Sequence, residues 1–238
     1  FILEPNPRAS RTMPFVSKVT GNQIIKAGTL LMLGHSLDSI KKTTNYLNSS
    51  TNKIAIKKAI FPWSRFPAED TMLGPEMKAT GEVLGIGRSF GVALNKAYAA
   101  AGVEINENEK GIFVSLSDQE KPNFIKIVKT YSDLGFKIYS TYGTGEYLKN
   151  NEINSTIVGR ADETFPTSLT ILQDKLISLV INTPTFANEY TDGWKIRRLS
   201  HETGVAVVSS VREAEAFLKA FLETTKSFED MEAIQNVS

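Results

Sequence analysis

Cysteine is absent from the 238 residues of the chain. Its absence excludes disulfide bonds, thiolate nucleophiles and Cys-ligated zinc, and it favours a reducing, cytoplasmic setting. Long apolar runs are lacking too, because the longest candidates, LLMLG and LISLVI, fall far short of the roughly 20 residues that span a bilayer. We therefore predict no membrane span and no signal peptide.

An excess of charge of either sign is also missing. The chain has 27 Lys and Arg against 26 Asp and Glu, a formal net charge of +1, and 41% of its residues are hydrophobic. Binding to nucleic-acid phosphates needs a surplus of Lys and Arg, so no nucleic-acid partner is predicted. The composition is typical of a globular protein of one or two domains. Because the chain begins at Phe1 inside the apolar run FILE, we expect it to be a piece of a longer protein.

Residues 111–238 alternate short β-rich runs with helix-like segments. The runs are IFVSL from Ile112, FKIYST from Phe136, STIV from Ser155, LISLVINT from Leu176 and VAVVSS from Val205. This alternation predicts an α/β domain with a doubly wound, five-stranded parallel sheet that helices cover on both faces. Domains of this class bind ligands beyond the carboxyl ends of their strands.

Residues that commonly begin and end helices flank the segments between these runs. Pro122 begins a helix that Gly135 ends, and Gly204 ends another helix before the last strand. Ser210 and Glu213 have the spacing of a capping box at the start of the last helix.

Residues 1–103 form a separate, less regular region, and we place the boundary in the polar stretch EINENEK at residues 104–110. The predicted elements are a strand in FILE, an apolar helix at 24–33, a strand from Lys53 and a helix containing Phe90, Leu94 and Ala97. Too few strands are visible to complete a sheet, so we expect part of this domain to lie upstream of the chain.

The glycine-rich segment LGIGRSFG matches two functional motifs. Gly87, Ser89 and Gly91 fit G-x-S-x-G, the nucleophile elbow of hydrolases. Together with Gly85 they resemble a dinucleotide-binding fingerprint, in which Glu104 would contact the ribose. We expect neither function, because no strand is visible before the motif and neither of the two histidines has the local signature of a triad base. The prediction is a glycine-rich entry into a helix.

Metal ligands in this chain have to come mostly from oxygen atoms, which favours magnesium bound together with phosphate. Glu4 and Asn6 lie two residues apart at the end of a predicted strand, so their side chains share a face. An acid and an amide oxygen with Arg8 close by suit a magnesium–nucleotide phosphate site. The same triplet is also common at strand ends that have no function.

Polar side chains gather where the predicted strands of residues 111–238 end. They are Thr141 and Thr144 in STYGTG, Asn182 and Thr183 after the fourth strand, and the cations Lys121 and Arg160. Hydroxyl groups, cations and the free N–H groups of a helix N-terminus together favour a phosphate-bearing small ligand. Taken one loop at a time, such residues are more often simple turns and caps.

The long motifs LEPNPRASRTMPFVSKVTG and LGPEMKATGEVLGIGRSF resemble the end of the second ATP-grasp unit in the large subunit of carbamoyl phosphate synthetase. The residues after Gly111, through STYGTG, VINTPT and DGWKIRR, resemble the methylglyoxal-synthase-like regulatory domain of that subunit. The resemblance covers essentially the whole chain. It implies a regulatory α/β domain at 111–238, preceded by the carboxyl-terminal portion of an α+β ATP-grasp domain at 1–103.

This family makes carbamoyl phosphate from bicarbonate, two ATP and ammonia that a glutamine amidotransferase small subunit releases. The resemblance implies that Glu4 and Asn6 hold Mg²⁺ or Mn²⁺ and that Arg8 contacts phosphate of the substrate ATP. The rest of the unit would lie upstream, so we expect the chain alone to be inactive. The motifs leave open whether the enzyme serves arginine or pyrimidine biosynthesis, and whether it forms oligomers.

Family members bind a nucleotide effector such as UMP or IMP, or an acylated glutamate, in the regulatory domain. The resemblance assigns to this pocket Lys121, Thr141, Thr144, Asn182 and Thr183, with Arg160 where lysine is frequent and Asp192 near the ribose. Arginine keeps the charge of lysine, so a phosphate ligand stays plausible.

Some members also bind ornithine between the two domains, through acidic and hydroxyl groups. At the matching positions this chain has Lys58 and Val207. Because a lysine repels the amine of ornithine, we predict no activation by ornithine.

Two other classes of function stay open. A methylglyoxal synthase of the same fold would act on a triose phosphate, and it needs a carboxylate base beside the phosphate. After the fourth strand the chain offers Asn182 and Glu189, which favours binding over catalysis. A pure interaction module would explain the βαβ units, but not the cations and hydroxyl groups that converge on one edge.

Overall fold

The structure, a computed structural model, describes residues 2, 5–44, 52–66, 70–71, 77, 81–103, 111–160, 163, 166–183 and 191–224. In chain order, its elements are α1 Thr12–Thr20, α2 Ile24–Met32, α3 Leu37–Thr43, β1 Ile54–Ile60, the 3₁₀ helix η1 Trp63–Arg65, β2 Gly81–Gly87, α4 Phe90–Ala100, β3 Gly111–Ser115, α5 Lys121–Asp133, β4 Lys137–Ser140, α6 Tyr142–Asn150, β5 Thr156–Ile157, α7 Ser168–Gln173, β6 Leu179–Asn182, α8 Asp192–Thr203, β7 Ala206–Val208 and α9 Val211–Thr224. The predicted boundary at 104–110 lies outside the described residues. No helix within the described ranges is long and apolar enough to cross a membrane.

Residues 111–224 form the second domain, whose strands β3 to β7 make a parallel sheet in the order β5-β4-β3-β6-β7. The predicted five-stranded, doubly wound fold is therefore confirmed. On the central strand β3, Ile112 and Val114 pack into the core beneath α5 and α9, whereas Phe113 packs into the core beneath α7 and α8. Successive residues of a strand point to opposite faces, so covering both faces requires the continuous apolar run that the sequence shows.

The predicted glycine ends of two helices of the second domain are confirmed. Gly135 and Gly204 follow α5 and α8 with φ angles of 85° and 76°, in the left-handed region that favours glycine. At the start of α9, the N–H of Glu213 donates to Ser210 Oγ over 3.3 Å. The Glu213 carboxylate accepts from the backbone N–H of Ser209 over 3.0 Å, so the return bond of the capping box forms one residue earlier than predicted.

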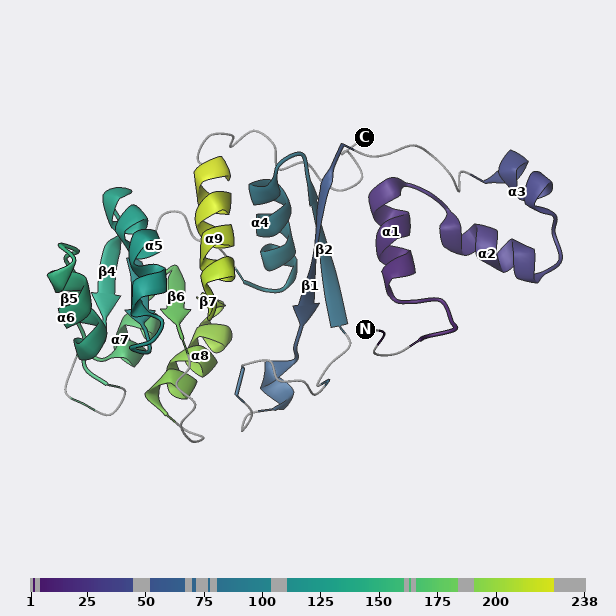
Figure 1. The fold of residues 1–238 in the computed structure, drawn as a ribbon. Helices are drawn as coiled ribbons and strands as arrows, with labels where there is room; N and C mark the ends of the chain where they lie inside the picture. The colour runs from purple at the N-terminus through teal and green to yellow at the C-terminus, as the bar shows by residue number, and fades with distance from the viewer. Residues whose placement is uncertain are drawn as a thin grey trace.

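Strands β1 and β2 of the first region pair antiparallel, and α4 packs between this hairpin and α9 of the second domain (Figure 1). Our expectation that no strand leads into the glycine-rich motif is wrong, because β2 ends at Gly87, just before Ser89. The antiparallel hairpin is neither the parallel sheet of a hydrolase nor a βαβ unit. Ser89 instead caps α4 by accepting the N–H of Val92 over 3.3 Å, which confirms the predicted helix entry.

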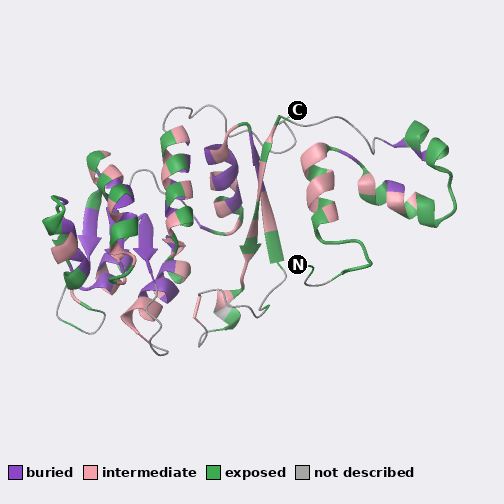
Figure 2. Cartoon of the chain, in the orientation of Figure 1, coloured by how far each residue is buried: buried purple, intermediate pink, exposed green. Residues whose placement is uncertain are grey.

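Helices α1 to α3 lie beyond the hairpin, on the side away from the second domain (Figure 1). The predicted apolar helix at 24–33 is confirmed as α2. Most of the surface of these helices is exposed or half-buried (Figure 2), and their buried residues are Ala27 and Ile40. Among the described residues, the two hydrophobic core clusters belong almost entirely to the second domain.

Candidate functional site

The candidate site lies at the carboxyl edge of the parallel sheet, where β3, β4 and β6 end. Thr141 follows β4 directly and occupies the N-cap position of α6. Thr144, in the first turn of α6, is buried, and its hydroxyl accepts bonds from Leu116 N over 3.0 Å and from Thr141 Oγ1 over 3.2 Å. Thr144 therefore ties the end of β3 to the start of α6 and positions Thr141.

Lys121 lies beside the start of α6. Its ammonium donates to the carbonyl oxygen of Gly143 over 2.8 Å and pairs with Asp118 Oδ1 at 2.5 Å. The Lys121 side chain is only 12% exposed, whereas the Asp118 side chain is 92% exposed. The structure thus brings Lys121, Thr141 and Thr144 together, and the cation is held at a helix N-terminus by a carboxylate that is mostly in solvent.

The N-terminus of α6 is not capped by the side chain of its N-cap residue. The side chain of Thr141 makes no cap hydrogen bond, whereas Thr167 and Thr191 cap α7 and α8 by accepting backbone N–H groups. The first N–H groups of a helix have no partner within the helix, and they carry the positive end of its dipole. With Lys121 adjacent, this end of α6 combines N–H donors, a hydroxyl and a cation, which suits a phosphate.

The strand β6 contributes two more predicted residues to the same edge. Thr183 Oγ1 accepts the backbone N–H of Ser117 over 2.7 Å. Asn182 is buried, and its Oδ1 accepts from Arg197 Nη1 over 2.6 Å. Both side chains are therefore fixed by hydrogen bonds within the protein before any ligand binds.

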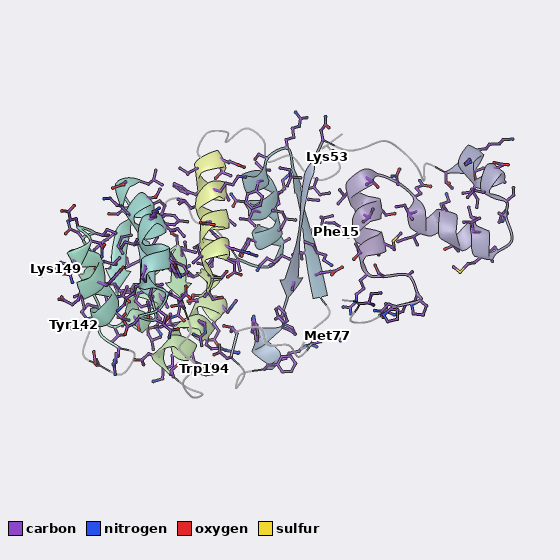
Figure 3. All side chains as sticks on the ribbon, viewed as in Figure 1. Phe15, Lys53, Met77, Tyr142, Lys149 and Trp194 are labelled. Atoms are coloured by element: carbon purple, nitrogen blue, oxygen red, sulfur yellow. The ribbon has the colours of Figure 1, made fainter. Side chains whose placement is uncertain are left out.

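The two remaining predicted residues lie together at the outside of the edge. Arg160 Nε and Asp192 Oδ2 are 3.8 Å apart, and the Arg160 side chain is 73% exposed. The arrows of β4 and β6 point toward the lower edge of the sheet in Figure 1. Tyr142 and Trp194, in the first turns of α6 and α8, lie at this edge (Figure 3). An exposed ion pair of this kind contributes little to stability, so Arg160 is free to turn toward a ligand.

The sequence did not single out Arg197 or Asp118 as site residues. Arg197 is buried on α8, and it bonds Asn182 on one side and Asp70 of the first region on the other. The pair Arg197–Arg198 follows Ile196, and all three residues are buried in the structure. Two arginines beside an apolar helix residue could have indicated buried partners, because a buried arginine needs charged or polar groups around it. No sequence pattern links Arg197 with a partner 127 residues away.

Asn6 and Arg8, two of the residues predicted to face ATP, lie on an exposed segment before α1. Arg8 Nη2 donates to Asn6 Oδ1 over 3.2 Å, whereas Glu4 lies outside the described residues. Arg11 Nη2 lies 3.8 Å from Met77 Sδ, so one residue of the first motif contacts one residue of the second. Among the described residues, no group of three His, Asp or Glu could hold a metal ion. The role of Asn6 as a metal ligand stays a prediction.

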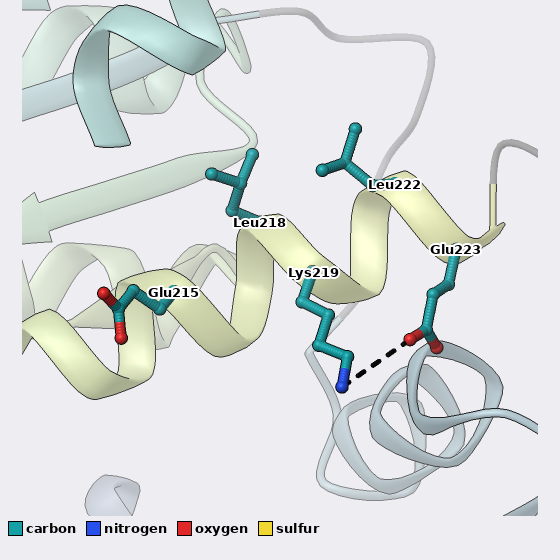
Figure 4. A pocket seen from close by; sticks show the side chains of 5 residues that line it. All are labelled: Glu215, Leu218, Lys219, Leu222 and Glu223. Carbon is teal, nitrogen blue, oxygen red and sulfur yellow. Dashed lines mark ion pairs between the residues drawn. The ribbon is translucent and has the colours of Figure 1, made fainter. Parts of the chain in front are cut away.

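A surface groove of about 310 Å³ runs along α9 (Figure 4). It is lined by Glu215, Leu218, Lys219, Leu222 and Glu223. Leu218 and Leu222 point to one side of the helix, whereas Lys219 and Glu223 point to the other and pair at 3.9 Å. Glu223 also accepts the N–H of Gly91 over 2.7 Å, so this carboxylate is engaged in holding α9 on α4. The sheet edge, where donors from several elements converge, is the better candidate site.

Lys58 of β1 lies at the junction of the two regions. Its ammonium is 4.1 Å from the centroid of the Tyr98 ring. Burial lowers the pKa of Lys58, and the nearby carboxylate of Glu213 raises it in part. Val207, the other position matched to ornithine binding, is half-buried in β7. The prediction that ornithine does not activate stays a prediction.

His201 of α8 packs at the same junction, with its ring centroid 5.7 Å from that of Trp63 in η1. Burial, followed by the positive charges of Lys58 and Arg198, lowers the pKa of His201 from 6.5 to about 4. At neutral pH the imidazole is therefore neutral, and it is kept so by its surroundings.

Acid is therefore expected to destabilise the fold through His201. In the unfolded chain this histidine binds its proton near pH 6.5, whereas the folded protein resists protonation down to about pH 4. The free energy of unfolding should fall as the pH drops through this window, by about 2–3 kcal/mol from this group. Urea unfolding of the wild type and of His201→Leu at pH 4.5, 5.5 and 7 measures it: the variant should show the shallower pH dependence, and equal dependences would contradict the assignment.

Residues 123–209 match the family described as the MGS-like domain, so the chain carries an α/β domain of that class. The whole chain is similar to carbamoyl phosphate synthase large chains. It is 38% identical to the large chain of Nostoc sp. over 235 residues. The matched region covers 99% of this chain and 21% of the relative. The chain is 37% identical over 243 residues to the C-terminal section of the large chain from Aquifex aeolicus, which covers 97% and 45%.

The C-terminal section from Methanocaldococcus jannaschii is 35% identical over 237 residues, which covers 96% of this chain and 38% of the relative. The resemblance deduced from the motifs is therefore confirmed. The chain is a homologue of carbamoyl phosphate synthase large chains along nearly its whole length, and it spans less than half the length of these relatives.

Proposed function

We propose that this chain is the carboxyl-terminal part of a glutamine-dependent carbamoyl phosphate synthase and that its second domain binds a phosphorylated effector, UMP or IMP first among the candidates. The observation that carries the proposal is the uncapped N-terminus of α6 with the ammonium of Lys121 beside it. A phosphate there would accept N–H bonds from the first turn of α6 and from the Thr141 hydroxyl. It would also displace Asp118 from Lys121, at small cost because Asp118 is mostly solvated.

The remaining edge residues would recognise the rest of the nucleotide. Asn182 and Thr183 line the end of β6, and the Arg160–Asp192 pair lies outside them. A ribose hydroxyl can donate to the Asp192 carboxylate, which would release Arg160 to a second acceptor on the ligand.

The first region would contribute to carbamate phosphorylation in the complete enzyme. In this proposal Glu4 and Asn6 hold Mg²⁺ or Mn²⁺, which neutralises charge on the phosphates of ATP when it is bound. Arg8, next to Asn6, offsets charge on the transferred phosphoryl group. A glutamine amidotransferase small subunit would supply ammonia, and the lack of cysteine favours a cytoplasmic location. The proximity of Arg11 to Met77, which joins the two ATP-grasp motifs, supports this part of the proposal.

Lyase chemistry on a triose phosphate is less well supported. That reaction needs a carboxylate base in a site that excludes water. Among the described residues of the edge, Asp118 is 92% exposed and paired with Lys121, and Asp192 is paired with Arg160, whereas Glu189 lies outside the described residues. Binding therefore explains the edge better than catalysis does.

Calorimetric titration of the chain with UMP, IMP and their nucleosides uridine and inosine tests the effector proposal. One nucleotide should bind at least about tenfold more tightly than its nucleoside, because only the phosphate engages Lys121 and the α6 N-terminus through charge-assisted bonds. Equal affinities would show that the phosphate is not recognised. Absence of binding by both nucleotides would contradict the choice of effector.

A further inference from the structure

Arg197 joins the candidate effector site to the first region through a single guanidinium group. Nη1 donates to Asn182 Oδ1 over 2.6 Å, at the sheet edge. Nε donates to Asp70 Oδ1 over 3.0 Å, and Nη2 donates to the other oxygen of the same carboxylate. The Arg197 side chain is 6% exposed, so its charge depends on these partners. An arginine fork that splits its donors in this way ties the position of one partner to that of the other.

Gly193 keeps space for the contact between Arg197 and Asn182. A Cβ at this position would lie 3.1 Å from Arg197 Nη1 and 3.4 Å from Asn182 Oδ1. The oxygen of Asn182 is occupied by Arg197. Among the described residues, its NH₂ group makes a long 3.5 Å contact to Ser115 O, so this group is left for a ligand. The amide is therefore oriented in advance as a donor, which is what the acceptor atoms of a nucleotide require.

The next residue anchors the same segment of the first region. Arg198 donates to the carbonyl oxygens of Trp63 and Phe66 over 2.7 and 2.8 Å. Two consecutive arginines of α8 thus hold Trp63, Phe66 and Asp70. Of these two arginines, Arg197 also bonds Asn182 at the sheet edge. A change at the sheet edge therefore reaches the first region through Arg197 and not through Arg198.

We infer that Arg197 couples occupancy of the sheet edge to Asp70 and to residues 63–66, which the neighbouring Arg198 holds. This inference rests on the proposed function and adds its route of regulation. A ligand that accepts from the NH₂ group of Asn182 stabilises the amide orientation in which its oxygen accepts from Arg197. The same ligand thereby strengthens the hydrogen bonds between Arg197 and Asp70. By reciprocity, loss of the Asp70 carboxylate weakens ligand binding at a site that Asp70 does not touch. The hydrogen bonds from Asn182 through Arg197 to Asp70 are continuous, so a change at either the ligand site or Asp70 shifts the position of Arg197.

Hydrogen exchange of the full chain, with UMP and IMP as probes, tests the coupling. The amides of Trp63, Arg65 and Phe66 are hydrogen-bonded in the structure, so their exchange reports how often this segment opens. In the wild type, bound nucleotide should slow their exchange at least about fivefold, the lower end of common coupling energies. In Asp70→Asn the slowing should disappear, and the affinity for the nucleotide should fall about fivefold by linkage.

Glu202→Gln is the matched control, because Glu202 pairs with Arg198 at 3.0 Å in the same helix and is not bonded to Arg197. It should keep both the nucleotide affinity and the slowed exchange of the wild type. Nucleotide binding with unchanged exchange in the wild type would overturn the coupling, even if Asp70→Asn does not fold. Slowed exchange that persists in Asp70→Asn would overturn it as well. If the wild type binds neither nucleotide, the proposed function itself fails, and the coupling fails with it.

Discussion

Replacing Gly85 by alanine is expected to lower the free energy of unfolding by about 3 kcal/mol or more, the upper range for overpacking in a core. A Cβ at Gly85 would lie 2.0 Å from the carbonyl oxygen of Ala93 and 2.6 Å from the backbone N of Ala97. Both atoms belong to the backbone of α4, so no rotation of a side chain relieves the clash. The whole helix would have to move away from β2, and α9, which packs on the other side of α4, opposes that movement.

The same substitution at Gly28 is the control. Gly28 lies inside α2, and a Cβ there would have no atom within 4 Å. Alanine should therefore stabilise the protein slightly, by up to about 1 kcal/mol, because it has the higher helix propensity. Urea unfolding of both variants measures the two changes. A Gly85→Ala variant as stable as the wild type would show that α4 is not held against β2 as described.

All five strands of the parallel sheet were predictable because each carries its own local signal. Both faces of β3 and β6 are buried, so their sequences are uninterrupted apolar runs that stand out between polar loops. The turns were predictable for a similar reason, since Gly135 and Gly204 occupy left-handed backbone positions that other residues avoid.

Strand β2 was not predicted because its glycines are required by the close packing of α4 and not by the strand itself. Its glycines at positions 81, 85 and 87 weaken the strand signal, yet at 85 and 87 only glycine lets α4 approach so closely. The close approach is a property of the packed structure, so the local pattern could not reveal it.

The sequence predicted which residues belong to the candidate site, but not the hydrogen bonds and ion pairs that join them. The positions of Lys121, Thr141, Asn182 and Thr183 after strands or before helices predict a common edge. The pairing of Lys121 with Asp118, and the bonds that join Asn182 to Arg197 and Asp70, depend on side-chain directions and on a contact between distant segments. The roles of all these residues toward a ligand stay predictions.

Lys121→Ala is expected to have the largest effect on ligand binding. The ammonium of Lys121 lies at the N-terminus of α6, next to Gly143, and its side chain is largely shielded from water. A phosphate bound there would lose a charge-assisted bond, which should weaken nucleotide binding by at least about tenfold. The fold should persist, because Lys121 belongs to neither core cluster. Lys126→Ala, an exposed lysine of the same helix, should leave the affinity unchanged and serves as the control.

Calorimetric titration of the wild type, Lys121→Ala and Lys126→Ala with the nucleotide that binds best is the most direct test of a phosphate site at the sheet edge. The account predicts that Lys126→Ala binds like the wild type, whereas Lys121→Ala loses at least about tenfold in affinity with unchanged urea unfolding. Equal affinities in the wild type and in folded Lys121→Ala would place the nucleotide elsewhere and contradict the account.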